Sequence, residues 1–324
     1  MDALQKFERF IILLFPGQGA QQVGMGKELS LAFTEAKELF EEVDDALSYR
    51  LSSLMFDGEQ EQLNLTIHAQ PAIFAVSLAV LKVLERQTGL SIDKIAKASA
   101  GHSLGEYSAL TAAGTFVVGD AIRVLKSRAE AMQKAAPIGR GGMVAVLDTD
   151  VEIVQRMIDE IDDIGVCEIA NDNGAGQVVL SCELHLIERI LDRTAKYGIR
   201  KAIRLPVTGP FHSSLMLPAA RDMDLVLSQV EMYIPKIPVH SNVSTKGYHT
   251  LEEVRALLVQ QIHSKVRWRE TMELFVKMEP THFIEIGPGR ILTNIAKKMF
   301  PNHNLECINI STPSGVEDFL TKHF

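Results

Sequence analysis

The stretch IAKASAGHSLGEYSALTAAG, residues 95–114, decides the fold prediction because it places a serine between glycines just before a helical pattern. The apolar run 95–101 predicts a buried strand, and the alanine-rich segment after Ser103 predicts a helix to about Ala113. The pentapeptide GHSLG, 101–105, fits G-x-S-x-G, in which a serine occupies a sharp strand-to-helix turn with its hydroxyl exposed. The stretch therefore predicts either a nucleophilic serine or a small residue at a tight turn.

Working outward, apolar runs alternate with helical patterns along most of the chain. Pro71 is expected to open one helix and Asp120 to cap the next. This alternation predicts an α/β fold, with a large α/β-hydrolase-like domain that has a mostly parallel sheet and helices on both faces. We expect strands at 10–15, 143–148, 165–170, 176–181, 200–206, 236–243 and 281–287, and helices at 27–48, 71–87, 121–136, 150–162, 184–197, 251–263 and 268–278.

The middle of the chain has a different pattern of elements. Its predicted order is βαββαβ, the arrangement of ferredoxin-like domains. We therefore expect an inserted ferredoxin-like small domain at 140–206. The large catalytic domain would then be discontinuous and formed by 1–139 and 207–324.

The composition is that of an ordinary globular protein, with 324 residues, 46% hydrophobic and 23% charged. A net charge of −8 argues against a nucleic-acid partner. The early apolar run 10–15 is too short to span a membrane, so we expect no membrane association and a cytoplasmic protein. Three cysteines far apart in sequence, with no CxxC, predict neither a disulfide framework nor a zinc site: Cys167, Cys182 and Cys307.

The first loop, GQGAQQVGMG at 17–26, fits neither phosphate-binding motif in detail. A dinucleotide fingerprint needs a third glycine where Gln22 stands, and a P-loop needs a lysine where Met25 stands. What remains is a loop at the carboxyl end of a strand, where ligand sites gather in open α/β sheets. Its backbone N–H groups are either free to face an anion or part of a plain turn.

A serine nucleophile needs a base, and the chain has ten histidines. His102 adjoins Ser103, but neighbours at a tight turn point apart, which makes His102 a poor base. His212 lies in a Pro/Gly-interrupted loop where the chain re-enters the large domain, a junction that favours active sites. The alternative is a solvent-exposed loop histidine. The helix N-terminus after Ser103 offers the N–H of Leu104, which can hold an oxyanion.

Arg128 is the candidate for binding an acidic substrate group. Helical spacing puts it on the shoulder of an apolar stripe, from which it can reach inward and pair with a carboxylate. Alternatively, only the apolar part of the Arg128 side chain packs against the protein, and its guanidinium lies in solvent.

The motifs together resemble the malonyl-CoA:acyl carrier protein transacylases, over nearly the whole chain. The match is to the stand-alone bacterial enzymes of fatty-acid synthesis rather than to domains of polyketide synthases. Six motifs occur in the order of that family: FPGQGAQQVGMG (15–26), TIHAQPAIFA (66–75), GHSLGEYSAL (101–110), KSRAEAMQ (126–133), GPFHSSLM (209–216) and EIGPGRILT (285–293).

The resemblance implies a role for each candidate residue in a ping-pong transfer of malonyl to the phosphopantetheine thiol of acyl carrier protein. Ser103 would be the nucleophile and His212 the base, oriented by an oxygen of Gln261 rather than by a carboxylate. Arg128 would clamp the malonyl carboxylate. The oxyanion hole would come from the N–H groups of Gln18 and Leu104, and the lining residues would be Gln70, Asn171 and Phe211.

The resemblance also implies partners and a substrate preference. Phe211 accompanies malonyl in related acyltransferases, because its ring would crowd a methyl on the substrate. No metal and no cofactor is expected, since malonyl-CoA is a substrate and phosphopantetheine belongs to the partner, and we expect a monomer. Acidic carrier protein would need a basic patch, and the candidates are Lys196, Arg200, Lys201 and Arg204, with Lys297 and Lys298.

Three other functions stay open from the sequence. One is a serine esterase or thioesterase, although no acid between 103 and 212 stands out as a triad member. Another is a trans-acting acyltransferase of polyketide synthesis, with the same chemistry and a different partner. A third is a catalytically silent module that only binds carrier protein.

Overall fold

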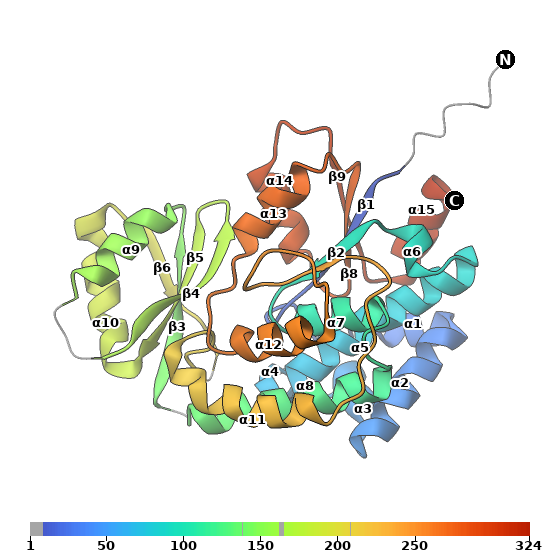
Figure 1. The fold of residues 1–324 in the computed structure, drawn as a ribbon, viewed down its shortest axis with the longest axis horizontal. Coiled ribbons are helices and arrows are strands. Elements are labelled where there is room, and N and C mark those ends of the chain that lie inside the picture. Colours follow the sequence, from blue (N-terminus) through green and yellow to red (C-terminus); the bar gives the residue numbers. More distant parts are fainter. Residues whose placement is uncertain (1–8, 138, 162–164, 208) are drawn as a thin grey trace.

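The protein was analysed as a computed structural model, which describes residues 9–137, 139–161, 165–207 and 209–324 (Figure 1). The strands are β1 (Ile11–Phe15), β2 (Ala98–Gly101), β3 (Gly141–Leu147), β4 (Cys167–Gly174), β5 (Gln177–Glu183), β6 (Lys201–Arg204), β7 (Val239–His240), β8 (His282–Ile286) and β9 (Glu306–Ile310). The α-helices are α1 (Lys27–Ala32), α2 (Thr34–Leu47), α3 (Leu51–Asp57), α4 (Gln60–Asn64), α5 (Thr66–Thr88), α6 (Ile92–Ile95), α7 (Leu104–Ala112), α8 (Val118–Ala135), α9 (Val151–Asp159), α10 (Leu184–Arg193), α11 (Leu217–Ser228), α12 (Leu251–Gln261), α13 (Trp268–Val276), α14 (Ile291–Met299) and α15 (Pro313–His323).

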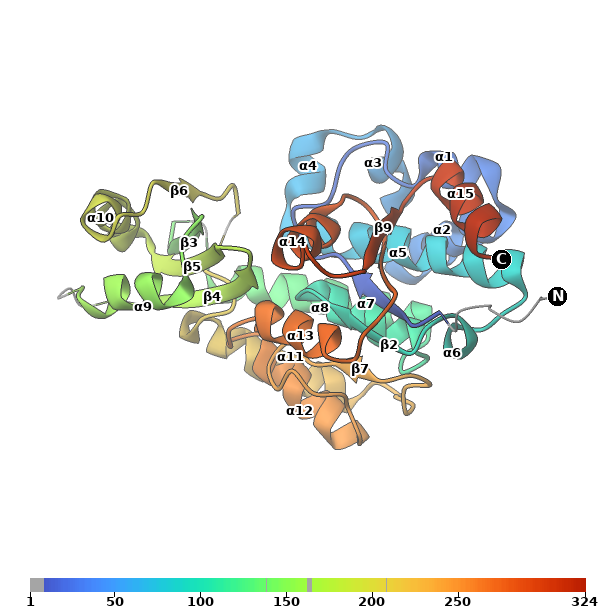
Figure 2. The same ribbon diagram turned by 90° about the horizontal axis from the view of Figure 1, so that it is seen from above.

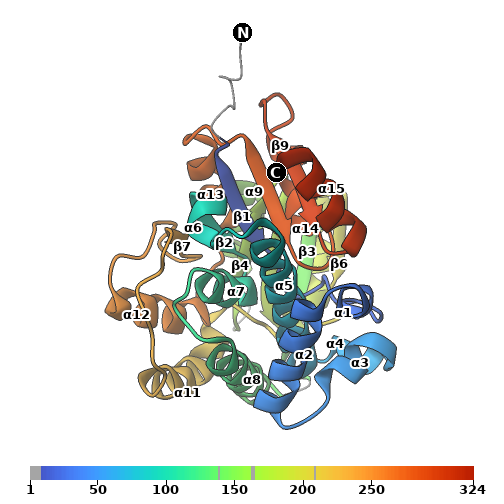
Figure 3. The same ribbon diagram turned by 90° about the vertical axis from the view of Figure 1, so that its right-hand side faces the viewer.

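A parallel sheet forms the centre of the larger part, with strand order β7-β2-β1-β8-β9. Strand β1 is buried on both faces, which explains its continuous apolar sequence. Leu13 and Phe15 point into a core that also holds residues of α2, α5, α7 and α8. Ile12 and Leu14 point to the other face, beneath α13 and α14. The mixed α/β prediction with helices on both faces of a parallel sheet is therefore confirmed (Figure 3).

A second, antiparallel sheet stands beside the first, with strand order β4-β5-β3-β6 (Figure 1). Along β3, Val144 and Val146 pack against α9 and α10. Met143 and Ala145 face the opposite way and line a cavity shared with the parallel sheet. Side chains of a strand alternate between its two faces, so one face of β3 packs in the core of the small sheet and the other lines the candidate site.

Two predictions of helix starts are wrong. Helix α5 begins at Thr66, so Pro71 lies inside it, where it removes one backbone hydrogen bond of the helix. Helix α8 begins at Val118 with Val117 at its N-cap, and Asp120 instead bonds Arg123 from within the first turn. Leu63 and Ala69 are fully buried around the first start, and Phe116 and Val118 are buried around the second, so packing outweighs the local preferences of Pro71 and Asp120.

Several strand and helix lengths also differ from the prediction. The segment 95–101 is a strand only from Ala98, because Ile92–Ile95 forms α6. Of 236–243, only Val239–His240 pairs as a strand, and 27–48 is divided into α1 and α2. The sequence patterns gave no prediction of α3, α4, α11, α14, β9 and α15.

The cysteines are closer in space than their sequence separation suggests. Cys167 and Cys182 are cross-strand partners on β4 and β5, with Sγ atoms 2.7 Å apart, and both are free thiols. Strand pairing brings them together, which spacing alone did not reveal.

One helix, α5, is long and apolar enough to cross a membrane by length and composition. Its apolar window is 83% buried inside the fold, as in the core helix of a globular protein (Figure 2). The prediction of a largely buried helix at this position is confirmed.

Candidate active site

Ser103 sits on a strained turn between β2 and α7. Its φ is 54° and its ψ −109°, a conformation that side chains rarely adopt. Close backbone approach explains both flanking glycines. A Cβ at Gly101 would lie 1.8 Å from Gly105 O, and a Cβ at Gly105 would lie 2.2 Å from Phe15 O. The G-x-S-x-G pattern is therefore a steric requirement of this turn.

Asn242 holds the turn in place from the loop after β7. Its Oδ1 accepts from the Ser103 N–H at 2.7 Å, and its Nδ2 donates to Gly101 O at 2.7 Å. The side chain thereby satisfies two backbone groups that a strained turn cannot pair internally.

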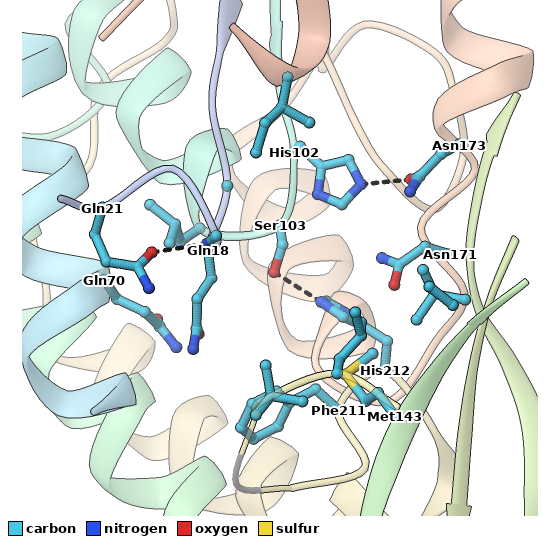
Figure 4. Close-up of a pocket in the computed structure, with 18 of the residues that line it drawn as sticks. Gln18, Gln21, Gln70, His102, Ser103, Met143, Asn171, Asn173, Phe211 and His212 are labelled. Carbon is cyan, nitrogen blue, oxygen red and sulfur yellow. Dashed lines mark hydrogen bonds between the residues drawn. The ribbon is translucent and has the colours of Figure 1, made fainter. Parts of the chain in front are cut away.

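Ser103 and His212 form a hydrogen-bonded pair although they lie far apart in sequence. Ser103 Oγ is 2.7 Å from His212 Nε2 (Figure 4). His212 Nδ1 is 2.8 Å from the main-chain O of Gln261, which can only accept, so Nδ1 carries the proton. The unprotonated Nε2 therefore faces the serine hydroxyl, as a general base requires. His102 instead bonds Asn173 Oδ1 through Nε2 at 2.8 Å.

The surroundings of His212 keep its imidazole neutral. Burial, and then the nearby Arg128 guanidinium, lower the pKa of His212 to about 3. His212 therefore stays uncharged across the whole physiological pH range.

We expect His212 to remain neutral when the pH is lowered to 5. An ordinary histidine, with a pKa of about 6.5, would then be roughly 97% protonated. The ¹⁵N chemical shifts of the His212 ring, assigned by comparison with His212→Gln, measure the charge directly. Titration of this ring between pH 6 and 7 would contradict the buried, neutral base. Because the folded pKa is lowered, this histidine also reduces stability as the pH falls from 6.5 toward 3.

Arg128 brings a buried positive charge to the serine. Its side chain is 1% exposed, and Nη2 donates to Ser103 Oγ at 3.0 Å and to Gln261 Oε1 at 2.9 Å. Nη1 donates to Gln70 Oε1 at 2.7 Å, while Nε is buried without a partner. Among the described residues, no carboxylate forms an ion pair with Arg128. Burial lowers its pKa from the ordinary value, yet a guanidinium stays charged.

Gln18 and Leu104 both border the space around Ser103. The N–H of Leu104 is the first of α7 and, like the N–H of Gln18, donates to no other group in the described part of the chain. Free N–H groups at a helix N-terminus stabilise developing negative charge.

The predicted residues meet in one cavity of about 430 Å³ between the two sheets. Gln18 and Gln70 lie on one side of Ser103, with Asn171 and Phe211 on others (Figure 4). Gln261 does not line this space, since it lies behind His212 and Arg128. The structure thus brings together Ser103, His212, Arg128, Gln18, Leu104, Gln70, Asn171 and Phe211.

Comparison with known proteins places this geometry in a family. The model of the acyl transferase domain matches residues 12–311. The chain belongs to the acyl transferase family. The malonyl CoA-acyl carrier protein transacylase of Bacillus subtilis is 41% identical over 308 residues, which cover 95% of each chain. The Escherichia coli K12 transacylase is 34% identical over 296 residues, covering 91% of this chain and 94% of its own.

Solved structures of acyl transferases have the same fold. The acyl-carrier-protein S-malonyltransferase of Bartonella henselae aligns with a TM-score of 0.93 and 43% identity, covering 97% of this chain and 99% of its own. A malonyl-transacylase solved in complex with a type II polyketide acyl-carrier protein aligns with a TM-score of 0.92 and 35% identity, covering 97% and 99%.

Sequence reasoning missed the buried polar network behind the site of this acyl transferase. Glu106 is fully buried in the first turn of α7. It accepts from Gln261 Nε2 at 2.7 Å, from the Asn242 N–H at 3.1 Å and from the Tyr248 hydroxyl. Gln261 Nε2 also donates to Ser103 O at 2.9 Å. In the sequence Glu106 resembles an ordinary acid of a helix N-terminus, so no local signal indicated its role.

We expect Glu106→Ala to destabilise the acyl transferase by about 3 kcal/mol at pH 8, because it leaves buried donors without an acceptor. Burial raises the pKa of Glu106 to about 7, so the folded state gains stability from its protonation as the pH falls below 7. Glu106→Ala lacks this gain. The difference in free energy of unfolding between the native protein and the variant should therefore be about 2 kcal/mol larger at pH 5.5 than at pH 8. Urea unfolding at both pH values measures this, and an equal deficit would contradict it.

Proposed function

We propose that this acyl transferase moves the malonyl group from malonyl-CoA to the phosphopantetheine thiol of acyl carrier protein, for fatty-acid synthesis. The observation that supports this most is the buried guanidinium of Arg128, which donates to Ser103 Oγ at 3.0 Å and has an unpartnered Nε. A buried cation without a carboxylate partner is costly unless a bound anion completes it. Malonyl supplies that anion beside its thioester, whereas acetyl does not. The names of the relatives support the same substrate and partner.

In the loading half-reaction, His212 Nε2 takes the proton of Ser103 as Oγ attacks the thioester carbonyl carbon. The carbonyl oxygen becomes an oxyanion, which the N–H groups of Leu104 and Gln18 stabilise. Losing one such donor typically costs about 2.7–4 kcal/mol. The carbon–sulfur bond then breaks, His212 returns the proton to the leaving sulfur, and CoA departs as a thiol. Malonyl remains as an ester on Ser103.

The transfer half-reaction reverses these roles. His212 takes the proton of the phosphopantetheine thiol, and the sulfur attacks the ester carbonyl carbon. The bond to Ser103 Oγ breaks and the serine recovers its proton from His212. Both halves proceed through Ser103, so the scheme requires no metal and no redox cofactor.

The remaining lining residues fit roles in positioning and selectivity. Gln70 holds the Arg128 guanidinium through its Oε1, at 2.7 Å from Nη1. Phe211 is 5% exposed and lines the cavity, where its ring narrows the space next to His212 for an α-methyl group. Asn171 lies on β4, where the small sheet borders the cavity.

Intact mass spectrometry with malonyl-CoA and no carrier protein tests the proposed function. We expect a malonyl adduct that phosphopantetheinylated carrier protein removes. Steady release of malonate would instead indicate a serine hydrolase, and neither adduct nor hydrolysis would indicate a binding module. The hydrolase alternative is disfavoured because the Nδ1 partner of His212 is a main-chain carbonyl rather than a carboxylate. Discharge by a polyketide carrier protein in preference to a fatty-acid one would favour the polyketide alternative.

The finer fold assignment is also a proposal. The order β3-α9-β4-β5-α10-β6 and its antiparallel sheet support a ferredoxin-like small domain at 140–206. The parallel sheet and the serine turn after β2 support an α/β-hydrolase-like large domain formed by 1–139 and 207–324. One chain supplies every group of the site, which supports a monomer, and a cytoplasmic location suits the proposed metabolism.

The two basic segments singled out in the sequence meet at Asp148, directly after the strand β3 that lines the cavity. Lys298 on α14 bonds Asp148 at 2.7 Å, and Lys201 at the start of β6 acts on the same carboxylate, lowering its pKa together with Lys298. The chain directly after β6 lines the cavity through Leu205 and Val207. A basic rim here would attract acidic carrier protein despite the net charge of −8.

We expect Arg200→Glu with Lys201→Glu to lower kcat/KM for carrier protein about tenfold at low salt, while the rate of malonyl loading stays unchanged. Both side chains are exposed, so charge rather than folding should change. Lys37→Glu with Lys82→Glu, on exposed positions of α2 and α5, is the matched control. Equal loss of loading and transfer, or an equal effect of the control, would count against this surface.

A further inference from the structure

Three potential metal ligands meet at the edge of the parallel sheet that lies opposite the serine. His282 begins β8 and Glu306 begins β9, and the two are in-register neighbours. His323 is the last residue of α15. Its ring packs against that of His282, with 4.9 Å between the ring centroids. One ligand atom from each of the three residues lies within 4.8 Å of the others. Ser103 follows the carboxyl end of β2, so this cluster is at the other end of the strands.

His323 presents a polar atom that the protein leaves unused. The residue is 5% exposed, and its Nε2 is buried without a hydrogen-bond partner. Buried nitrogen atoms in native proteins are almost always paired. This unpartnered nitrogen belongs to a residue that clusters with another imidazole and a carboxylate, so it is available to a ligand.

The surroundings of His282 also suit a metal-bound histidine. Its Nδ1 lies 2.8 Å from Thr281 Oγ1, and its Nε2 lies 3.4 Å from Glu306 Oε2, which is longer than an ordinary hydrogen bond. An ion between Nε2 and Oε2 would bind both atoms. A second hydrogen bond that fixes the ring is also the usual environment of a metal-bound histidine.

Lys322 occupies only one oxygen of the Glu306 carboxylate. Its Nζ donates to Oε1 at 2.5 Å, which leaves Oε2 for the histidines. The second oxygen is therefore available to bind a metal ion.

We propose that His282, Glu306 and His323 form a binding site for a divalent transition-metal ion of the Zn²⁺ class. Two imidazoles and one carboxylate are a ligand set typical of such ions, with a remaining position for water. Ligands at about 2.0–2.2 Å from Zn²⁺ require the three atoms to draw closer together, which the terminal turn of α15 can provide. A surface cavity of about 320 Å³, lined by Glu306 and His323, gives the ion an entry path.

The consequence would be structural rather than catalytic. The metal would link the end of α15 to the first residues of β8 and β9, which are neighbouring strands of the parallel sheet (Figure 3). No sequence motif indicated this site, because the three ligands are widely separated along the chain and include no cysteine.

Zn²⁺ binding to the full chain, measured by competition with a chromophoric chelator, tests the proposal. We expect one equivalent whose Kd rises at least about tenfold in His282→Ala and in His323→Ala. Thr281→Ala should also weaken binding, since it frees the His282 ring. Zn²⁺ should raise the Tm of the native chain by on the order of 2 °C and leave the Tm of His323→Ala unchanged. Malonyl loading by each variant confirms that it is folded.

His303→Ala provides the matched control, because His303 is exposed nearby and outside the cluster. Equal binding by the native chain and His323→Ala, or equal weakening by His303→Ala, would overturn the proposal. The Co²⁺ derivative separates this site from the close pair Cys167 and Cys182. Nitrogen and oxygen ligands give visible d–d bands alone, whereas a thiolate-to-cobalt charge-transfer band would show that the ion sits on the cysteines instead.

Discussion

Ser103→Ala is expected to abolish the malonyl adduct and to lower transfer to carrier protein by at least about 10⁴-fold. The substitution removes the only atom that forms the ester, while His212 and the two backbone amides stay in place. Malonyl-CoA should still bind, because Arg128 keeps its guanidinium and loses only the contact of 3.0 Å with Ser103 Oγ. Rapid-quench loading followed by intact mass measures the chemical step, and calorimetric titration measures the retained binding.

Ser108→Ala is the matched control for this experiment. Ser108 lies on the same helix, α7, is fully buried, and its hydroxyl has no hydrogen-bond partner. We expect that variant to load malonyl at the native rate. An adduct that persists in Ser103→Ala would mean that another nucleophile carries the acyl group, and the proposed mechanism would be wrong.

The chemistry of this site was predictable where a residue's role depends on local backbone geometry. Gly101 and Gly105 are required because any side chain there would collide with the backbone. The five-residue motif G-x-S-x-G therefore identifies this turn from sequence alone. The pairing of Ser103 with His212 followed from the resemblance and from the position of His212 in an interrupted loop. Arg128 could be placed on the shoulder of its helix by periodicity alone.

The supporting residues were not predictable, because their roles depend on contacts between distant segments. Asn242 clamps the turn across 139 positions of sequence, and Glu106 reaches Tyr248 across 142. Neither residue has a distinctive local pattern. The pairing of β8 with β9 likewise depends on the completed sheet, so the approach of His282 to Glu306 could be seen only in the fold.

Arg128→Ala is expected to change which acyl group the enzyme accepts. Arg128 would form a buried charge pair with the malonyl carboxylate. Truncating one partner of such a pair costs about 2–5 kcal/mol, so malonyl loading should fall by roughly 10²- to 10³-fold. Acetyl loading lacks the carboxylate and should change little by comparison. The informative quantity is therefore the ratio of malonyl to acetyl loading rates, since general damage to the site would lower both rates and leave the ratio unchanged.

Two further variants separate charge from shape at this position. Arg128→Lys keeps the charge but cannot bond Gln70, Ser103 and Gln261 together, so it should recover only part of the ratio. Arg123→Ala, on an exposed face of the same helix, should leave the ratio at its native value. If Arg128→Ala lowered both rates in parallel, the guanidinium would be a structural support of the Ser103 turn. The acid selectivity of the enzyme would then have to come from another group in the cavity.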